Sequence, residues 1–217
     1  MTAPKARPIL FSAPMVLAIL EGRKMQTRRV VKRQGDMEFD PQDPHYGPYW
    51  LAYAAGDAEG ENARVRCPYG KPGDLLWVRE THALVPASAY LCSKGVQQTI
   101  NPVDPYYASI YRQGWDRSES GIRWRPSIHM PRWASRITLE IAAVRVERLQ
   151  DISEDDARAE GINCGNPEPC ECASPEPSAK DAFCYLWHQI HGCNSWHTNP
   201  WVWVVEFHRS SQPTGEV

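Results

Sequence analysis

The sequence predicts an α+β fold in which a mixed sheet rolls into a small barrel with flanking helices and long loop insertions. Strand-like and helix-like segments follow one another in the order strand, helix, strand, strands, helix, helix, strand, with no internal repeat. The segment 135–149 alternates β-branched and polar residues, as a long strand does. Residues 201–208 carry apolar side chains on both faces, which indicates a central strand.

The first three elements occupy the N-terminal segment. Residues 8–12 predict a short buried strand, and residues 13–21 have apolar side chains at helical spacing. Gly22 stands where a C′ glycine ends a helix. Residues 25–31 then predict a strand that leaves the turn.

The middle of the chain has weaker patterns. Residues 34–73 are rich in Pro, Gly, Asp and Tyr without a sustained period, so we expect a long loop or an inserted excursion there. The turn at 71–74 leads into a predicted strand over 75–80. Residues 81–126 are expected to be irregular, with short strands around 106–111.

Two helices precede the last strand. The pattern at 153–156 matches a capping box and predicts a short helix to Glu160, closed by Gly161. Residues 164–178, rich in Pro, Cys and Glu, form no regular element, and 179–191 predict an amphipathic helix. Its expected apolar face consists of Phe183, Leu186, Trp187 and Ile190.

Composition limits the class of protein. The 217 residues carry 24 basic and 26 acidic side chains, so no overall charge attracts nucleic acid. No long apolar stretch predicts a membrane span, and we expect a cytoplasmic protein without a membrane partner. The motifs of P-loop enzymes, dinucleotide-binding folds and α/β-hydrolases are absent from the sequence.

Basic residues nevertheless gather in two stretches. The first has no acidic residue within it and comprises Arg23, Lys24, Arg28, Arg29, Lys32 and Arg33. The second is interleaved with Trp115, Trp124 and Trp133 and comprises Arg112, Arg117, Arg123, Arg125, Arg132 and Arg136. Arginine beside tryptophan suits base stacking and phosphate contact, and the alternative is a solvated face whose tryptophans pin a loop.

The seven cysteines have two interpretations. Cys164, Cys170 and Cys172 lie in one insertion, with histidines downstream, and a structural zinc site would give order to such a loop. Their spacing lacks a paired Cys-x-x-Cys, so free thiols are the alternative. Cys184, beside Phe183 in the predicted helix, is expected in the core.

The segment Leu20-Glu-Gly-Arg-Lys-Met-Gln-Thr-Arg28 resembles the signature of the ASCH domain family, in which a Gly-x-Lys-x-x-Thr-x-Arg run follows the first helix. Further similar pieces follow in the family's order at 72–78, 149–161 and 203–207. The chain looks most like the larger phage- and prophage-encoded members. On this resemblance, residues 1–217 form a single PUA-like domain with insertions at about 34–70, 81–126 and 163–178.

The resemblance implies a nucleoside or single-stranded nucleic acid as partner. Some bacterial family members are amidohydrolases that remove the acetyl group of N4-acetylcytidine and require no cofactor. Their lysine, threonine and glutamate correspond to Lys24, Thr27 and Glu160 here. Other members bind RNA or are described as ribonucleases, so a binding module and a ribonuclease are the alternatives.

Those three residue types suit amide hydrolysis. The hydroxyl of Thr27 serves as a nucleophile once a base removes its proton, and Lys24 becomes that base if burial and neighbouring cations lower its pKa. Glu160 assists by orienting the lysine or carrying a proton, although its charge raises the lysine pKa. The alternative is a helix-capping cation and an ordinary strand residue. The residues predicted to bind substrate or nucleic acid are Arg23, Arg28, Arg29, Trp124, Arg125, Arg132 and Trp133.

Overall fold

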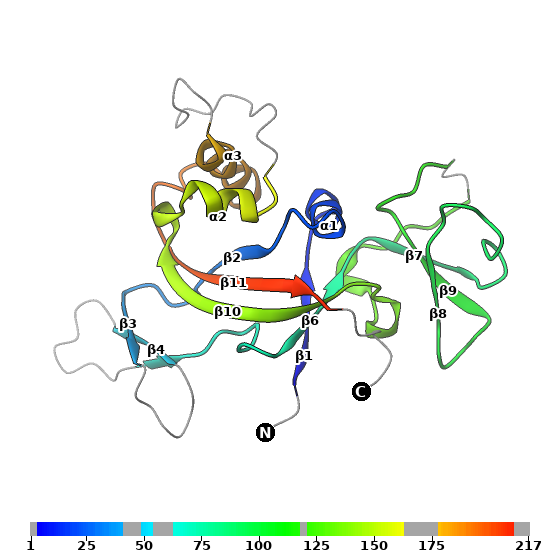
Figure 1. Cartoon of the computed structure of the whole chain (residues 1–217), viewed down its shortest axis with the longest axis horizontal. Coiled ribbons are helices and arrows are strands. Elements are labelled where there is room, and N and C mark those ends of the chain that lie inside the picture. The colour runs from blue at the N-terminus through cyan, green and yellow to red at the C-terminus, as the bar shows by residue number, and fades with distance from the viewer. Residues whose placement is uncertain (1–3, 41–48, 54–62, 118–120, 163–177, 211–217) are drawn as a thin grey trace. The chain divides into compact units, whose positions relative to one another are not determined.

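The computed structural model describes residues 4–40, 49–53, 63–117, 121–162 and 178–210. These residues fall into two compact units built from interleaved segments of the chain (Figure 1). Unit 1 comprises 1–22, 72–141 and 207–217, and unit 2 comprises 23–71 and 142–206. The predicted mixture of helices and strands is confirmed, whereas a single domain with insertions stays a prediction.

Unit 1 contains a mixed sheet and the first helix. Strand β6 (Leu75–Arg79) pairs in parallel with β1 (Ala6–Leu10) and antiparallel with the beginning of β10 (Thr138–Arg148). Helix α1 (Ala13–Leu20) is followed by Gly22 at φ +74°, in the left-handed conformation expected of a helix-ending glycine. The core contains Ile9, Phe11, Val16, Ile19, Leu76, Val78, Ile137, Leu139 and Phe207.

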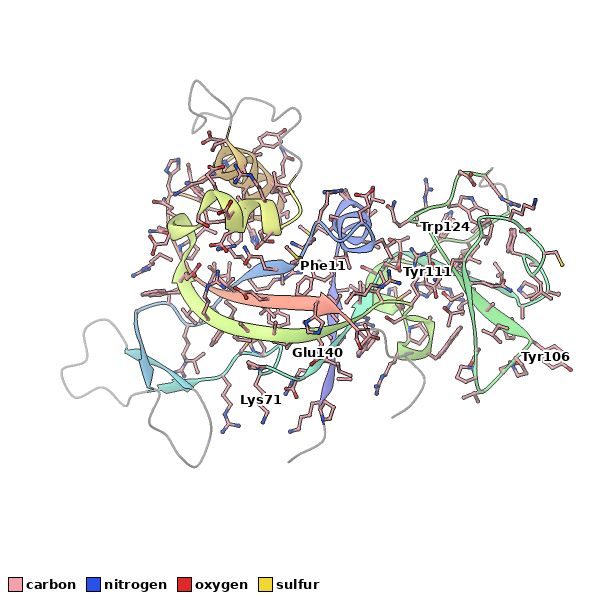
Figure 2. All side chains as sticks on the ribbon, viewed as in Figure 1. Phe11, Lys71, Tyr106, Tyr111, Trp124 and Glu140 are labelled. Carbon is pink, nitrogen blue, oxygen red and sulfur yellow. The ribbon has the colours of Figure 1, made fainter. Side chains whose placement is uncertain are left out.

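The prediction for 81–126 was right in part: a short strand does lie at 107–111, but two further strands were not expected. Strands β7 (His82–Pro86), β9 (Tyr107–Tyr111) and β8 (Gln98–Ile100) form an antiparallel sheet in that order. Each strand is too short to show a period of its own, and its partners lie in separate parts of the segment. Tyr106, just before β9, is 82% exposed and projects from this sheet in Figure 2. Two short 3-10 helices follow at Ser127–His129 and Arg132–Ala134.

Tyr111 joins this small sheet to the following segment. Its hydroxyl donates to the carbonyl of Ala134 at 2.8 Å and bonds the hydroxyl of Thr99. Arg136 lies over its ring at 4.1 Å and makes a two-pronged ion pair with Glu80, both bonds at 2.8 Å. Arg136, which belongs to the second basic stretch, therefore forms an ion pair with a buried carboxylate.

The Tyr111 phenol makes stability depend on pH. Burial raises its pKa from 10.0 to about 12, against the smaller opposing effects of Thr99 and Arg136. Between these values the unfolded chain loses the phenolic proton while the folded chain keeps it, so the free energy of unfolding falls as pH rises. We expect the free energy of unfolding, measured in urea, to fall less steeply with pH above 10.0 in Tyr111→Phe than in the wild type. Equal slopes for both proteins would contradict the assignment.

Unit 2 is organised around the predicted central strand. Strand β11 (Trp201–Arg209) lies between β10 and β2 (Gln26–Val30), and it pairs with β2 in antiparallel register, Val205 opposite Thr27. The side chains from Val202 to Val205 are all buried, which confirms that both faces of this strand are covered.

The prediction that 34–73 is a loop was also wrong in part. Strands β3 (Asp36–Asp40), β4 (Tyr49–Tyr53) and β5 (Ala63–Val65) form a second antiparallel sheet of unit 2. The segment forming β4 is rich in aromatic residues, which favour strands, but the surrounding Pro and Gly obscured this signal.

Two helices complete unit 2 (Figure 1). A 3-10 turn (Leu149–Asp151) precedes α2 (Glu154–Ala159), whose N-cap Ser153 accepts a hydrogen bond from the amide of Asp156 at 3.1 Å. Helix α3 (Ala179–His191) has the predicted bounds and begins with a full capping box at Ser178. Its predicted apolar face needs correction at Ile190, which is 52% exposed. The buried face instead contains Ala179, Ala182, Phe183, Cys184 and Trp187.

In the part of the chain that the structure describes, each strand order is open at both ends. The α+β class is thus confirmed, and closure into a small barrel stays a prediction. No helix among these residues has the length and apolar character needed to cross a membrane.

Candidate active site

Lys24 and Glu160 form a buried ion pair in unit 2. The Lys24 Nζ donates to Oε2 of Glu160 at 2.6 Å and to the backbone carbonyl of the same residue at 2.9 Å. Lys24 is 3% exposed and Glu160 5% exposed. The two backbones also form an isolated antiparallel bridge, and the Met25 amide donates to the Ala159 carbonyl at 2.8 Å. The chain thus brings together two of the three predicted catalytic residues.

The end of α2 explains why these residues meet. Glu160 is the C-cap of this short helix, and Gly161 then takes φ +85°, which lets the chain turn away. Arg23 donates to the Gly161 carbonyl at 2.9 Å, and Lys24 donates to the Glu160 carbonyl. Cations suit these carbonyls because the helix C-terminus carries partial negative charge. The capping interpretation of Lys24 was made for the helix that precedes it, whereas the carbonyl that its amine binds belongs to the end of α2.

Arg28 binds the other oxygen of the Glu160 carboxylate. Its Nη1 lies 3.3 Å from Oε1 of Glu160, and its Nη2 lies 3.1 Å from Oε2 of Glu147 and 3.2 Å from Oδ2 of Asp156. The Arg28 side chain is 0% exposed. Arg28 was predicted to contact substrate, but it is enclosed by three carboxylates and is not available to a ligand at the surface.

Arg145 extends this arrangement toward solvent. It binds Glu147 and Glu206, and its Nη2 lies 3.1 Å from Oδ1 of Asp156. The Arg145 side chain is 29% exposed and that of Glu206 is 41% exposed, in contrast to the enclosed Arg28. We call the whole set the ionic cluster: Lys24, Arg28, Arg145, Glu147, Asp156, Glu160 and Glu206.

Burial changes the pKa of Lys24, the most enclosed cation of the ionic cluster together with Arg28. Desolvation lowers the pKa of Lys24 below the usual 10.5, the charge and hydrogen bond of Glu160 oppose this, and Arg29 and Arg28 lower the pKa further. At the outer part, burial alone would raise the pKa of Asp156, but a hydrogen bond from Gln26 and the charges of Arg28 and Arg145 outweigh it and leave that pKa below the usual value. A lysine whose pKa is lowered inside a site is a candidate base.

Thr27 lies on β2 and is 2% exposed. Side chains alternate along a strand. Its neighbours Gln26 and Arg28 both reach residues of the α2 segment, with the Gln26 amide donating to the Asp156 carbonyl at 2.6 Å. The Thr27 side chain therefore projects from the other face of β2 than these two neighbours. Lys24 and Glu160 are brought together, and Thr27 is close to them in the chain but on this opposite strand face.

Of the residues in unit 1 that were predicted to bind substrate or nucleic acid, the tryptophans are half-buried and the arginines are exposed. The half-buried Trp124 packs edge-on against Trp115 at 5.7 Å, and Trp133 packs against the cluster of Tyr111, Met130 and Ala134. These contacts favour the interpretation in which tryptophans pin the loop to the unit. Arg125 and Arg132, in contrast, are exposed.

The predicted zinc ligands Cys164, Cys170 and Cys172 lie outside the described residues. Within the described ranges, no three His, Cys, Asp or Glu side chains are grouped so as to hold a metal ion. Cys184 is 2% exposed in the core beside α3, as predicted. Zinc therefore stays a prediction: protein purified without chelator should contain an equimolar amount, and a metal-free protein would remove the idea.

Sequence reasoning missed most of the ionic cluster. Arg145 and Glu147 are two residues apart on β10 and so share one face of that strand, where alternating apolar residues were expected. This charged pair was the available signal, and Glu206 on β11 was a second. Comparison with protein-family models, curated proteins and solved structures finds no match.

Proposed function

We propose that the chain is an ASCH-like amidohydrolase with a PUA-like barrel, acting on an N-acylated pyrimidine nucleoside such as N4-acetylcytidine. The observation that carries the proposal is the buried contact of 2.6 Å between Lys24 and Glu160, the pair that the resemblance assigns to the site. The resemblance also assigns Thr27. Burying a lysine against a carboxylate costs desolvation free energy, and lysines with a shifted pKa cluster at functional sites.

The reaction conserves atoms and protons in two stages. Thr27 projects from the face of β2 opposite Gln26 and Arg28, so the reaction requires its side chain to turn toward the Lys24 amine. Its oxygen then attacks the acyl carbon while its proton moves to the neutral amine. The bond from the acyl carbon to the exocyclic nitrogen of the base then breaks, and the Lys24 ammonium returns the proton to that nitrogen. Water next attacks the threonine ester and loses a proton to Lys24. As the ester bond breaks, the Lys24 ammonium returns that proton to the Thr27 oxygen and the carboxylic acid leaves. Glu160 orients the lysine throughout.

The pH dependence follows from the Lys24 amine. Only the neutral amine accepts a proton, and desolvation lowers its pKa below 10.5. We expect kcat/KM for N4-acetylcytidine to rise with pH and to level off below pH 10.5. Glu160→Gln removes the opposing negative charge, so its plateau should begin at lower pH than that of the wild type. A Glu160→Gln profile displaced upward would contradict this reasoning.

Thr27 is tested by three substitutions. With Thr27 as nucleophile, Thr27→Ser keeps measurable release of cytidine, while Thr27→Val and Thr27→Ala lose it. Thr27→Val retains the shape of a buried strand residue, so it separates chemistry from packing. If Thr27→Val hydrolyses the substrate like the wild type, the nucleophile is water activated by Lys24, and the threonine assignment falls. No turnover of any N4-acylated cytidine by the wild type would overturn the proposed reaction.

A second candidate is binding of single-stranded nucleic acid without chemistry. It is favoured by a group of exposed arginines in unit 1: Arg112, Arg117, Arg123, Arg125 and Arg132. Phosphate contacts release counterions, so binding of a labelled oligonucleotide should weaken steeply with added salt. The double variant Arg125→Gln/Arg132→Gln should reduce the salt dependence, and salt-independent binding would argue against this function.

A further inference from the structure

Arg28 is the residue through which the inner and outer parts of the ionic cluster meet. One of its nitrogens faces Glu160, and the other is shared by Glu147 on β10 and Asp156 on α2. The guanidinium also lies over the Phe183 ring of α3 at 5.9 Å, so its position is held from a further element. With its side chain at 0% exposure, Arg28 has a fixed place and no contact with solvent.

The Glu160 carboxylate is divided between two cations. Oε2 accepts from Lys24 at 2.6 Å, and Oε1 faces Arg28 at 3.3 Å. We propose that Arg28 is a positioning residue for this pair: by binding the second oxygen it fixes the carboxylate and shares its negative charge, which leaves the Lys24 amine freer to give up a proton. For catalysis this inference rests on the function proposed above, but the effect on Lys24 exists without substrate.

Arginine suits this role better than lysine does. Its planar fork reaches carboxylates on two sides at once, as it does between Glu160 and the Glu147–Asp156 pair. A guanidinium stays charged in proteins, so Arg28 contributes charge and carries no protons. The cluster is thus an electrostatic support for Lys24 and no proton relay.

The charged groups facing Lys24 come from several elements. Glu160, at the end of α2, opposes loss of its proton, whereas Arg28 and Arg29 of β2 favour it. Asp156 of α2, together with Arg145 and Glu147 of β10 and Glu206 of β11, completes the surroundings of Arg28. On α3, His191 lies within electrostatic range of Arg29. Removing Arg28 takes away one nearby cation and frees Glu160 to act on Lys24 alone.

The direct test is the titration of Lys24 in protein carrying ¹³C-labelled lysine. The Lys24 resonance is identified by its absence in Lys24→Arg, and its pKa is measured by NMR in the wild type and in Arg28→Gln. We expect the pKa of Lys24 to rise in Arg28→Gln and to be partly restored in Arg28→Lys. The matched control is Arg158→Gln, an exposed arginine of α2 that pairs with Glu154 and Asp155 and should leave Lys24 unchanged.

A folded Arg28→Gln protein with an unchanged or lowered Lys24 pKa would overturn the inference. If this variant fails to fold, Arg28→Gln/Asp156→Asn removes one charge of each sign, and its Lys24 pKa is compared with that of Asp156→Asn alone. A higher value in the double variant supports the inference, and an equal or lower value refutes it. Because this measurement uses no substrate, a failure to hydrolyse acylated cytidine would refute the proposed function without touching the role of Arg28.

Discussion

Lys24→Met should lower kcat/KM for N4-acetylcytidine by about 10²–10⁴-fold, the usual contribution of a general base. Methionine keeps an unbranched side chain of similar length at a site that is 3% exposed, and it cannot accept a proton. Glu160 keeps Arg28 as a partner in this variant, so the fold should survive the loss of the amine. The measurement is the initial rate of cytidine release, followed across a range of substrate concentrations.

The matched control for this prediction is Lys32→Met. Lys32 belongs to the same basic stretch but is exposed, so its loss should leave turnover near the wild-type value. Circular dichroism of both variants checks that any loss of rate is not a loss of fold. Wild-type rates in a folded Lys24→Met protein would show that the amine takes no part in the chemistry, and Lys24 would then be only a cap of α2.

Trp203→Ala should reduce the free energy of unfolding by about 3–5 kcal/mol. Trp203 is 2% exposed in β11, opposite Arg29 of β2, and its truncation removes a large apolar surface and leaves a cavity. A loss of this size is a large fraction of the stability of an ordinary domain, so little folded protein is expected at elevated temperature. Urea unfolding followed by circular dichroism measures the change.

Val30→Ala is the comparison for this second prediction. Val30 lies on the neighbouring strand β2 and is 40% exposed, so its truncation should cost well under about 1 kcal/mol. If Trp203→Ala and Val30→Ala lower stability equally, the core of unit 2 does not depend on β11 in the way described. The comparison needs both transitions to be two-state.

The elements that could be predicted from the sequence are those whose signal lies within one short window. Helix α3 shows a helical period over 179–191 and was located with its correct bounds, and β11 shows two apolar faces over its own length. In the sheets of β3–β5 and β7–β9, β9 was expected around 106–111 but its partner strands, each of three to five residues, were not. Such strands are stabilised by pairing with partners elsewhere in the chain, which no local pattern displays.

The candidate site divides in the same way. The contact of Lys24 with Glu160 was expected from the resemblance. The two residues lie 136 positions apart in the chain, so only the fold brings them together. Arg28 lies near Lys24 in the sequence and was predicted as one of several substrate-binding cations. No neighbouring residue indicated that Glu147, 119 positions away, contacts it. Ion pairs between distant elements are set by strand register and helix ends, which follow only once the fold is known.

The interleaving of the two units orders events during synthesis. Lys24 leaves the ribosome 136 residues ahead of Glu160, which at 5–20 residues per second is a delay of about 7–27 s. Strand β11, the partner of β2, emerges later still. During translation the Lys24 amine therefore stays hydrated until Glu160 emerges, and β2 pairs with β11 only after that later strand has left the ribosome.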